Sequence, residues 1–255
     1  MSSRSADLVN RKFTPAQKQA LIAALCERLS PERVKRLHEV LGARTRRVTL
    51  VLEDIFEMHN AAACLRTCEA FGVQDAHFII NRNDAFAGSK GSGVSRGSEK
   101  WLCVTRWGTR SHHWKDPETA PYPHTQECLN SLKEKGYRLV ATTLRADSVP
   151  PENIPTDKPI ALLIGSEHRG LSQTAHDLAD MAVQIPMVGF VQSLNLSVCA
   201  AMLLRALTKN MREQQTQIGL SEDEKRDLLF TWLCRDIAEH EEIAKRTLGD
   251  EFTGQ

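Results

Sequence analysis

Three segments hold residues whose types and spacing could carry out chemistry. The first, HNAAACLRTCEAFGV (59–73), places the cation Arg66 among small residues at helical spacing, so that its guanidinium can extend across a helix toward a ligand. An exposed ion pair with Glu69 is the alternative, and the spacing alone favours it. Cys64 and Cys68 lie one turn apart, but no second pair or nearby His accompanies them, so we expect core thiols and no metal site.

The second segment, IALLIGSEHRGLS (160–172), joins an apolar strand to a polar turn between two glycines and then to a helix. In open α/β sheets, ligands bind beyond the carboxyl ends of the strands, which is where Gly165–Gly170 must lie. The turn lacks both the Gly-Lys-Ser/Thr of a P-loop and the G-x-G-x-x-G dinucleotide fingerprint. The basic Gly/Ser stretch 88–98 suits backbone contacts with phosphate, with a plain flexible loop as the alternative.

The third segment, IPMVGFVQSLNLSVCAAMLL (185–204), is an apolar loop followed by a helix that Ser193 or Asn195 caps. Because surface loops are normally polar, we expect this loop to pack against another strand crossing, a ligand or a partner subunit. The apolar start of its helix and the alanines 61–63 suit packing against a second chain or against the protein's own sheet. Each segment alone is weakly specific, whereas their order and spacing together are specific.

These segments need a scaffold, and the sequence supplies alternating strands and helices from Val48 onward. Short apolar runs predict strands at 48–53, 77–80, 101–105, 137–143, 160–165 and 181–186. Helices are expected at 60–71, 124–135, 171–179 and 195–212. Strands this apolar are usually covered on both faces, so we expect an α/β fold with a mostly parallel sheet. Residues 108–123 interrupt the pattern as an exposed insertion, and capping boxes are expected at Thr14–Gln17 and Ser221–Glu224.

The composition is that of a folded protein. The 255 residues are 41% hydrophobic and 25% charged, which excludes a disordered chain and allows one large domain or two small ones. No apolar run approaches the roughly 20 residues that span a bilayer, and the N-terminus lacks an apolar signal core. We therefore expect a cytoplasmic protein with no membrane partner. Seven scattered cysteines predict free thiols.

The net charge of +1 conceals an uneven distribution. Residues 1–47 hold 11 Lys and Arg against 4 Asp and Glu, whereas residues 211–255 hold 6 against 11. We divide the chain into a basic helical extension at 1–47, an α/β domain at 48–212 and a C-terminal helical extension at 213–255. Nucleic-acid binding by the basic head is favoured over a merely solvated face, and for the acidic tail a solvated face stays open.

The three segments, in this order, resemble the three motifs of the SpoU family of RNA 2′-O-ribose methyltransferases, and most of all its tRNA guanosine-2′-O-methyltransferase (TrmH) branch. The resemblance covers about residues 31–245. It implies a SPOUT-type α/β fold with a trefoil knot, S-adenosylmethionine as methyl donor, a homodimer, and methylation of a tRNA ribose at a D-loop guanosine. The alternatives are a ribosomal RNA target, a non-catalytic RNA-binding protein on the same scaffold, and an unrelated nucleotide-binding α/β enzyme.

Carried over by motif position, the resemblance places the family's catalytic arginine on Arg66 and its motif asparagine on Asn60. It implies cofactor contacts at Thr142, Gly165, Glu167, Ile185, Ser193, Leu194 and Asn195. Because an arginine stays protonated at neutral pH, we favour stabilisation of the developing 2′-alkoxide by Arg66 over proton abstraction. The cations expected to hold tRNA phosphates are Arg33, Arg36, Arg44 and Arg46.

Overall fold

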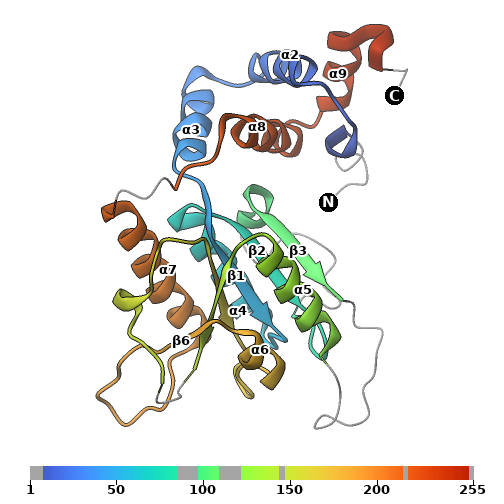
Figure 1. Cartoon of the computed structure of the whole chain (residues 1–255). Coiled ribbons are helices and arrows are strands. Elements are labelled where there is room, and N and C mark those ends of the chain that lie inside the picture. Colours follow the sequence, from blue (N-terminus) through green and yellow to red (C-terminus); the bar gives the residue numbers. More distant parts are fainter. Residues whose placement is uncertain (1–7, 86–96, 109–121, 144–146, 215–217, 253–255) are drawn as a thin grey trace. The chain divides into compact units, whose positions relative to one another are not determined.

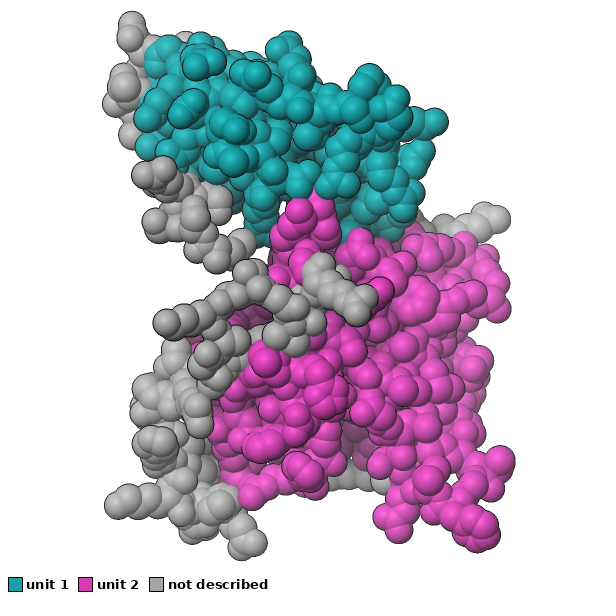
Figure 2. Space-filling view, turned by 180° about the vertical axis from the view of Figure 1, so that it is seen from behind, with its two compact units in different colours: residues 1–44, 219–255 teal, residues 45–218 magenta. Residues whose placement is uncertain are grey.

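The chain forms two compact units, which Figure 2 distinguishes by colour. The computed structural model describes residues 8–85, 97–108, 122–143, 147–214 and 218–252. One unit is 45–218, and the other combines 1–44 with 219–255. The sequence suggested three consecutive parts instead, so the two helical ends belong together rather than forming separate extensions. None of the helices in the described ranges has the length and apolar character needed to cross a bilayer.

The larger unit is built on a six-stranded sheet in which all neighbouring strands are parallel (Figure 1). Its strands are β1 (Thr45–Glu53), β2 (Val73–Ile79), β3 (Cys103–Trp107), β4 (Arg138–Thr142), β5 (Ile160–Ile164) and β6 (Met181–Val183). The parallel α/β sheet expected from the apolar runs is thus confirmed. The spatial order is β3-β2-β1-β5-β4-β6, so the direction of winding reverses between β1 and β5. Open α/β sheets bind ligands beyond the carboxyl ends of the strands at such a point.

Helices cover both faces of this sheet (Figure 1). α4 (Met58–Phe71) and α7 (Leu196–Glu213) pack together on the face to which β1 directs Leu50 and Leu52. α5 (Pro123–Glu134) and α6 (Gln173–Leu178) share the opposite core with Val51, as the alternation of side chains along a strand requires. The short 3₁₀ turns η1 (Ser98–Trp101) and η2 (Pro151–Asn153) lie in the connections. The predicted loop 88–98 and insertion 108–123 fall mostly outside the described residues.

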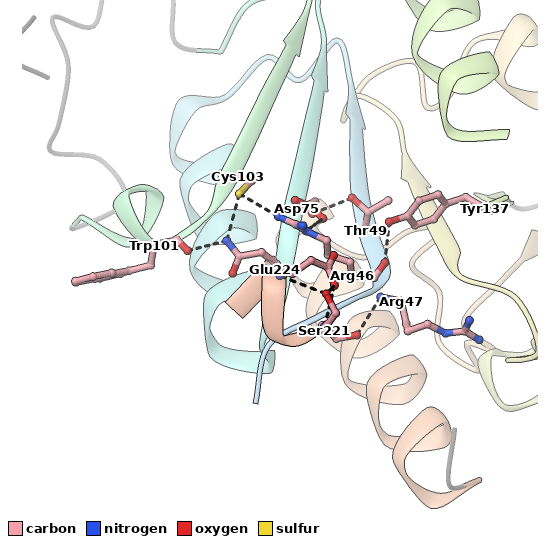
Figure 3. A network of polar contacts seen from close by, with 11 residues as sticks. Arg46, Arg47, Thr49, Asp75, Trp101, Cys103, Tyr137, Ser221 and Glu224 are labelled. Carbon is pink, nitrogen blue, oxygen red and sulfur yellow. Dashed lines mark hydrogen bonds and ion pairs between the residues drawn. The ribbon is translucent and has the colours of Figure 1, made fainter. Parts of the chain in front are cut away.

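Two strands begin earlier than their apolar runs predicted, because polar residues within them bond to other parts of the chain. Gln74 of β2 is fully buried, and its Nε2 donates to the carbonyl oxygen of Trp101 at 3.0 Å. Asp75 pairs with Arg46 at the start of β1, with 3.1 Å between Nε and Oδ2 (Figure 3). A buried polar residue with a partner costs little, so it can occupy a strand without an apolar pattern to reveal it.

The smaller unit is entirely helical in its described part. Its helices are α2 (Pro15–Cys26), α3 (Pro31–Gly42), α8 (Glu222–Asp236) and α9 (His240–Leu248), followed by the 3₁₀ turn η3 (Gly249–Phe252). The capping boxes at Thr14 and Ser221 are both confirmed. The last helical residue of α3 is Gly42, and Ala43 is its C-terminal cap. Contacts of α2 with α8 and α9, and of α3 with α8, join the two ends of the chain.

Charge neutralisation accompanies this packing. Residues 1–44 and 219–255 together contain 14 Lys and Arg and 14 Asp and Glu, so the smaller unit has no net charge. Lys18 lies 2.7 Å from Asp227, and Arg33 lies 2.9 Å from Asp236. The basic head therefore folds with the acidic tail, and fewer of its cations are available to phosphate than the sequence alone indicated.

Candidate functional site

The turn that follows β5 closes on itself and requires glycine at its start. The N–H of Ser166 donates to the Gly170 oxygen at 3.1 Å, and the N–H of Gly170 donates to the Ser166 oxygen at 2.9 Å. A Cβ on Gly165 would lie 2.0 Å from the carbonyl carbon of Gly170 and 2.1 Å from the nitrogen of Leu171. Both are backbone atoms, so no side chain fits at position 165 while the turn keeps this shape.

A cavity of about 610 Å³ lies at the carboxyl ends of β4, β5 and β6. We call it the knot-loop cavity after the knot that the family resemblance leads us to expect in this region. Its volume lies within the range of roughly 300–1,000 Å³ that is typical of small-molecule sites. The structure brings together on its wall all seven residues expected at the cofactor, namely Thr142, Gly165, Glu167, Ile185, Ser193, Leu194 and Asn195. Three segments that are distant in sequence thus meet at one place.

Apolar side chains supply about half of the remaining wall of the knot-loop cavity. They include Ile164, Leu171, Val183, Met187, Leu196 and Leu203. His176 and Cys199 also line it, although sequence reasoning did not single them out; the only signal was that Cys199 follows Asn195 by one helical turn. Burial raises the pKa of the Cys199 thiol to about 11, so this thiol remains protonated at neutral pH. An apolar slot with a few polar groups suits a flat heterocycle.

Asn60, Glu167 and Asn195 form a hydrogen-bonded chain that connects the three segments. Asn60 is buried, and its Nδ2 donates to Glu167 Oε1 at 2.7 Å. Asn195 Nδ2 donates to Asn60 Oδ1 at 3.3 Å, while Asn195 Oδ1 caps α7 by accepting the N–H of Ser197 at 2.9 Å. The N–H of Phe56 donates to Glu167 Oε2 at 3.4 Å. Asn60 therefore connects α4 both to the Gly165–Gly170 turn and to the residue that caps α7.

Arg66 lies apart from this chain of hydrogen bonds. Its side chain is exposed on α4, whereas Asn60 on the same helix is buried. Among the described residues, those that line the knot-loop cavity do not include Arg66. Within one chain, the structure thus does not bring the expected catalytic arginine to the expected cofactor residues. Its guanidinium is accessible to a second chain or to a large substrate.

A second cavity, of about 570 Å³, lies at the carboxyl end of β1, and we call it the β1 cavity. Its lining residues are Glu53, Asp54, Phe56, Arg82, Asn83, Tyr122, Ser166, His168, Arg169, Gly170, Leu171, Ser172 and Gln173. Four of them, Ser166, Arg169, Gly170 and Leu171, also line the knot-loop cavity. The turn after β5 is therefore a wall common to both cavities.

Two adjacent carboxyl groups at the end of β1 organise the β1 cavity. Glu53 Oε2 accepts the N–H of Ser172 and Glu53 Oε1 accepts its hydroxyl, each at 2.7 Å, and Thr125 donates a further short hydrogen bond. Asp54 Oδ1 accepts the backbone N–H groups of residues 81, 82 and 83 at 2.8, 2.8 and 3.3 Å. Burial raises the pKa of both carboxyl groups. Sequence reasoning passed over this pair, although its place after an apolar strand was a usable signal.

The cations expected to hold tRNA phosphates lie in different surroundings. Arg36 is the most exposed of the four arginines, with 68% of its side chain accessible. Its Nη1 lies 3.3 Å from Oε2 of Glu39. Arg44 is only 1% exposed, and its guanidinium carbon lies 5.2 Å from the centre of the Trp232 ring. The structure thus removes Arg44 from the surface, contrary to the expectation, because the C-terminal helices of the smaller unit cover it.

Arg33 and Arg46 are each paired with a carboxylate. The Arg33 side chain is 41% exposed and binds Asp236, and Arg46 is 36% exposed and binds Asp75. Figure 3 shows that Arg46 also points toward the sulfur of Cys103, which its Nη2 approaches at 3.8 Å. A phosphate contact by either arginine must therefore compete with an existing ion pair.

The sequence has close relatives of established activity. Residues 47–205 match the SpoU rRNA Methylase family. The tRNA (guanosine(18)-2′-O)-methyltransferase of Borreliella burgdorferi is 33% identical over 222 residues, which are 87% of this chain and 94% of that protein. The enzyme of the same name from Thermus thermophilus is 39% identical over 172 residues, which are 68% of this chain and 79% of that protein.

Solved structures agree with this relationship. The crystal structure of the TrmH/SpoU tRNA modifying enzyme from A. aeolicus superposes with a TM-score of 0.65 at 29% identity, covering 81% of this chain and 97% of that one. The SpoU methyltransferase AviRb from Streptomyces viridochromogenes, solved with AdoMet, has the same fold at 22% identity and a TM-score of 0.53. The family match over residues 47–205 and the relatives that align over most of their length show that the chain belongs to the SpoU methylase family.

Proposed function

We propose that this protein transfers the methyl group of S-adenosylmethionine to the 2′-hydroxyl of a tRNA ribose, at a guanosine of the D-loop, in the cytoplasm. The observation that carries the proposal is the knot-loop cavity, whose wall unites the seven expected cofactor residues. The relatives that match over most of their length support the tRNA target, because their names specify tRNA guanosine 18.

A ribosomal RNA target is the second candidate. The 23S rRNA (guanosine-2′-O-)-methyltransferase RlmB of Neisseria meningitidis is 33% identical over 159 residues. Those residues are 61% of this chain and only 55% of that protein, whereas the Borreliella tRNA enzyme is matched over 94% of its length. Similarity beyond the central domain therefore favours tRNA.

The residues of the knot-loop cavity fit S-adenosylmethionine. The absence of a side chain at Gly165 lets the turn fold against the strand end, and the apolar wall suits the adenine ring. The polar groups of Thr142, Glu167 and Asn195 lie among these apolar residues. When bound, this cofactor supplies a methyl group on a positively charged sulfur, so no metal is needed to activate it. The chain's task is to hold the two reactants and to assist loss of the hydroxyl proton.

The carboxylate of Glu167 is the best-anchored polar group at this place. Asn60 Nδ2 and the N–H of Phe56 each donate to one of its oxygens. Both donors belong to the segment that follows β1, so α4 and the Gly165–Gly170 turn are held in a fixed relation. We propose that Asn60 is a positioning residue, and that Glu167 orients the turn rather than accepting the proton.

We propose that Arg66 stabilises the 2′-oxygen as its proton leaves. A guanidinium is protonated at neutral pH and presents N–H donors to a developing negative charge, whereas acting as a base would require an extreme pKa shift. A phosphate of the RNA or a water molecule then accepts the proton. Because Arg66 is exposed and outside the cavity wall, the RNA or a second chain must complete this part of the site.

We further propose a homodimer that uses the apolar surface around the start of α7. The exposed large apolar residues of this region are Val188, Phe190, Val191, Val198 and Met202. Phe190 is fully exposed within one chain, which is unusual for an aromatic side chain with apolar neighbours. The trefoil knot implied by the family resemblance belongs to the same proposal, because it would fold the apolar segment 185–196 into this surface.

The test is methyl transfer from labelled S-adenosylmethionine to a tRNA transcript and to ribosomal RNA, with nucleoside mass spectrometry to locate the product. We expect 2′-O-methylguanosine in tRNA. Arg66→Ala should lower the rate by about 10²–10³ while leaving cofactor affinity unchanged, as for loss of one oxyanion donor. Arg66→Lys is the matched variant, since it retains the charge and loses the planar fork. Near-normal turnover of Arg66→Ala on saturating tRNA would contradict its role, and product in ribosomal RNA alone would establish the second candidate.

A further inference from the structure

The β1 cavity lies directly beside the proposed cofactor site, and the proposed methyl transfer does not use it. The two cavities have Ser166, Arg169, Gly170 and Leu171 in common, so a ligand in the β1 cavity would be separated from the cofactor only by the turn after β5. The cavity also lies where the sheet reverses its winding between β1 and β5. Its volume of about 570 Å³ is that of a small-molecule site.

An exposed aromatic ring lines the β1 cavity. Phe56 is 56% exposed, and its ring meets the His168 ring edge to face, with 6.0 Å between centroids and an angle of 71°. The hydrogen bond from its backbone N–H to Glu167 helps to hold Phe56 next to the cofactor wall. Proteins use such accessible aromatic faces to stack unpaired bases of single-stranded nucleic acid.

Two guanidinium groups accompany this ring. Arg82 lies over the Tyr122 ring, 4.7 Å from its centre, and Arg169 comes from the turn common to both cavities. Asp54 fixes the backbone at Arg82 by accepting its N–H at 2.8 Å. Arginines beside aromatic rings provide charge for a phosphate and a stacking surface for a base, and here both lie in one concave site.

We propose that the β1 cavity binds one nucleotide of the RNA substrate, with its base stacked on Phe56 and its phosphate at Arg82 and Arg169. The inference rests on the proposed methyltransferase function and adds the place at which the RNA strand enters. A base held here is withdrawn from the folded RNA, and the attached backbone passes next to the cofactor. The β1 cavity thus positions the reacting ribose, which the knot-loop cavity alone does not.

The first test compares Phe56→Ala with Phe56→Tyr and with Lys158→Ala. Lys158 is an exposed cation just before the amino end of β5, whereas the cavity lies at the carboxyl ends of the strands. Phe56→Ala should weaken RNA binding and raise KM for tRNA on the order of tenfold, the effect of losing one base–aromatic stack. Phe56→Tyr should restore both, and cofactor affinity should be unchanged in all three. Because the Phe56 side chain is exposed, the Phe56→Ala variant should unfold at the same midpoint as the wild type. Equal midpoints exclude misfolding as the cause of weaker RNA binding.

The second test identifies the stacked base. Wild type and Phe56→Ala are compared on a series of tRNA substrates in which single D-loop nucleotides lack their base. At one position, the removal of the base should abolish the difference in RNA affinity and in KM between wild type and Phe56→Ala. An unchanged difference at every position, or equal RNA affinity of the two proteins, would overturn the proposal. A wild type that methylates no RNA would instead contradict the proposed function itself, so the two failures are distinguishable.

Discussion

Replacing Gly165 by alanine tests whether the turn after β5 forms the cofactor site. The added Cβ would lie 2.0 Å from the carbonyl carbon and 2.2 Å from the oxygen of Gly170, where ordinary contacts begin near 3.4 Å. The turn must therefore move by more than an ångström, which breaks the two hydrogen bonds between Ser166 and Gly170. At about 0.5–1.5 kcal/mol each, their loss should lower the free energy of unfolding by about 1–3 kcal/mol.

The assay combines urea unfolding with calorimetric titration of S-adenosylmethionine. Because the moved turn is a wall of the knot-loop cavity, cofactor affinity should fall by at least about tenfold, which corresponds to 1.4 kcal/mol. Gly42→Ala is the matched control, since no atom lies within 4 Å of its Cβ position and it ends a helix. That variant should be neutral or stabilising by up to about 1 kcal/mol, with unchanged cofactor affinity. Cofactor binding by Gly165→Ala at the wild-type affinity would refute the assignment of this turn.

Three further outcomes follow from the described contacts. Arg36→Ala should weaken tRNA binding and reduce its salt dependence by up to about 0.7–0.9 in log–log slope. Arg44→Ala should mainly lower the free energy of unfolding, by about 2 kcal/mol, because a buried cation–π contact is lost. Salt titrations of tRNA binding and urea unfolding of both variants distinguish the two effects. His77 accepts the Trp107 indole N–H, and burial lowers its pKa from 6.5 to about 4, so its contribution to stability is present above pH 6.5 and lost toward pH 4. His77→Gln should remove up to about 3 kcal/mol of that pH dependence, and an unchanged pH profile of unfolding would show that the ring is not neutral in the fold. Phe190→Glu should dissociate the proposed dimer in sedimentation experiments, and a wild-type monomer would contradict it.

Local patterns in the sequence predicted most of the secondary structure and one of the two cavities. Apolar runs predicted the existence of all six strands, because strands covered on both faces are rich in apolar side chains. They missed the first residues of β1 and β2, where polar side chains pair with other parts of the chain. Thr14 and Ser221 predicted their helix starts, since capping is a contact between near neighbours in the chain. The glycine turn at 165–170 predicted a ligand site at a strand end, and the knot-loop cavity lies there.

Interactions between distant parts of the chain were decided only by the tertiary structure. The place of Glu53 and Asp54 after an apolar strand showed only that they lie at a strand end. The cavity depends on their partners at Thr125, Ser172 and residues 81–83, which are distant in sequence. The association of the N- and C-terminal helices likewise depends on partners about 200 residues apart, and it buries Arg44 and neutralises the basic head. The sequence by itself determined the charges and the elements that carry them; which charges stay accessible depends on the surfaces that packing covers.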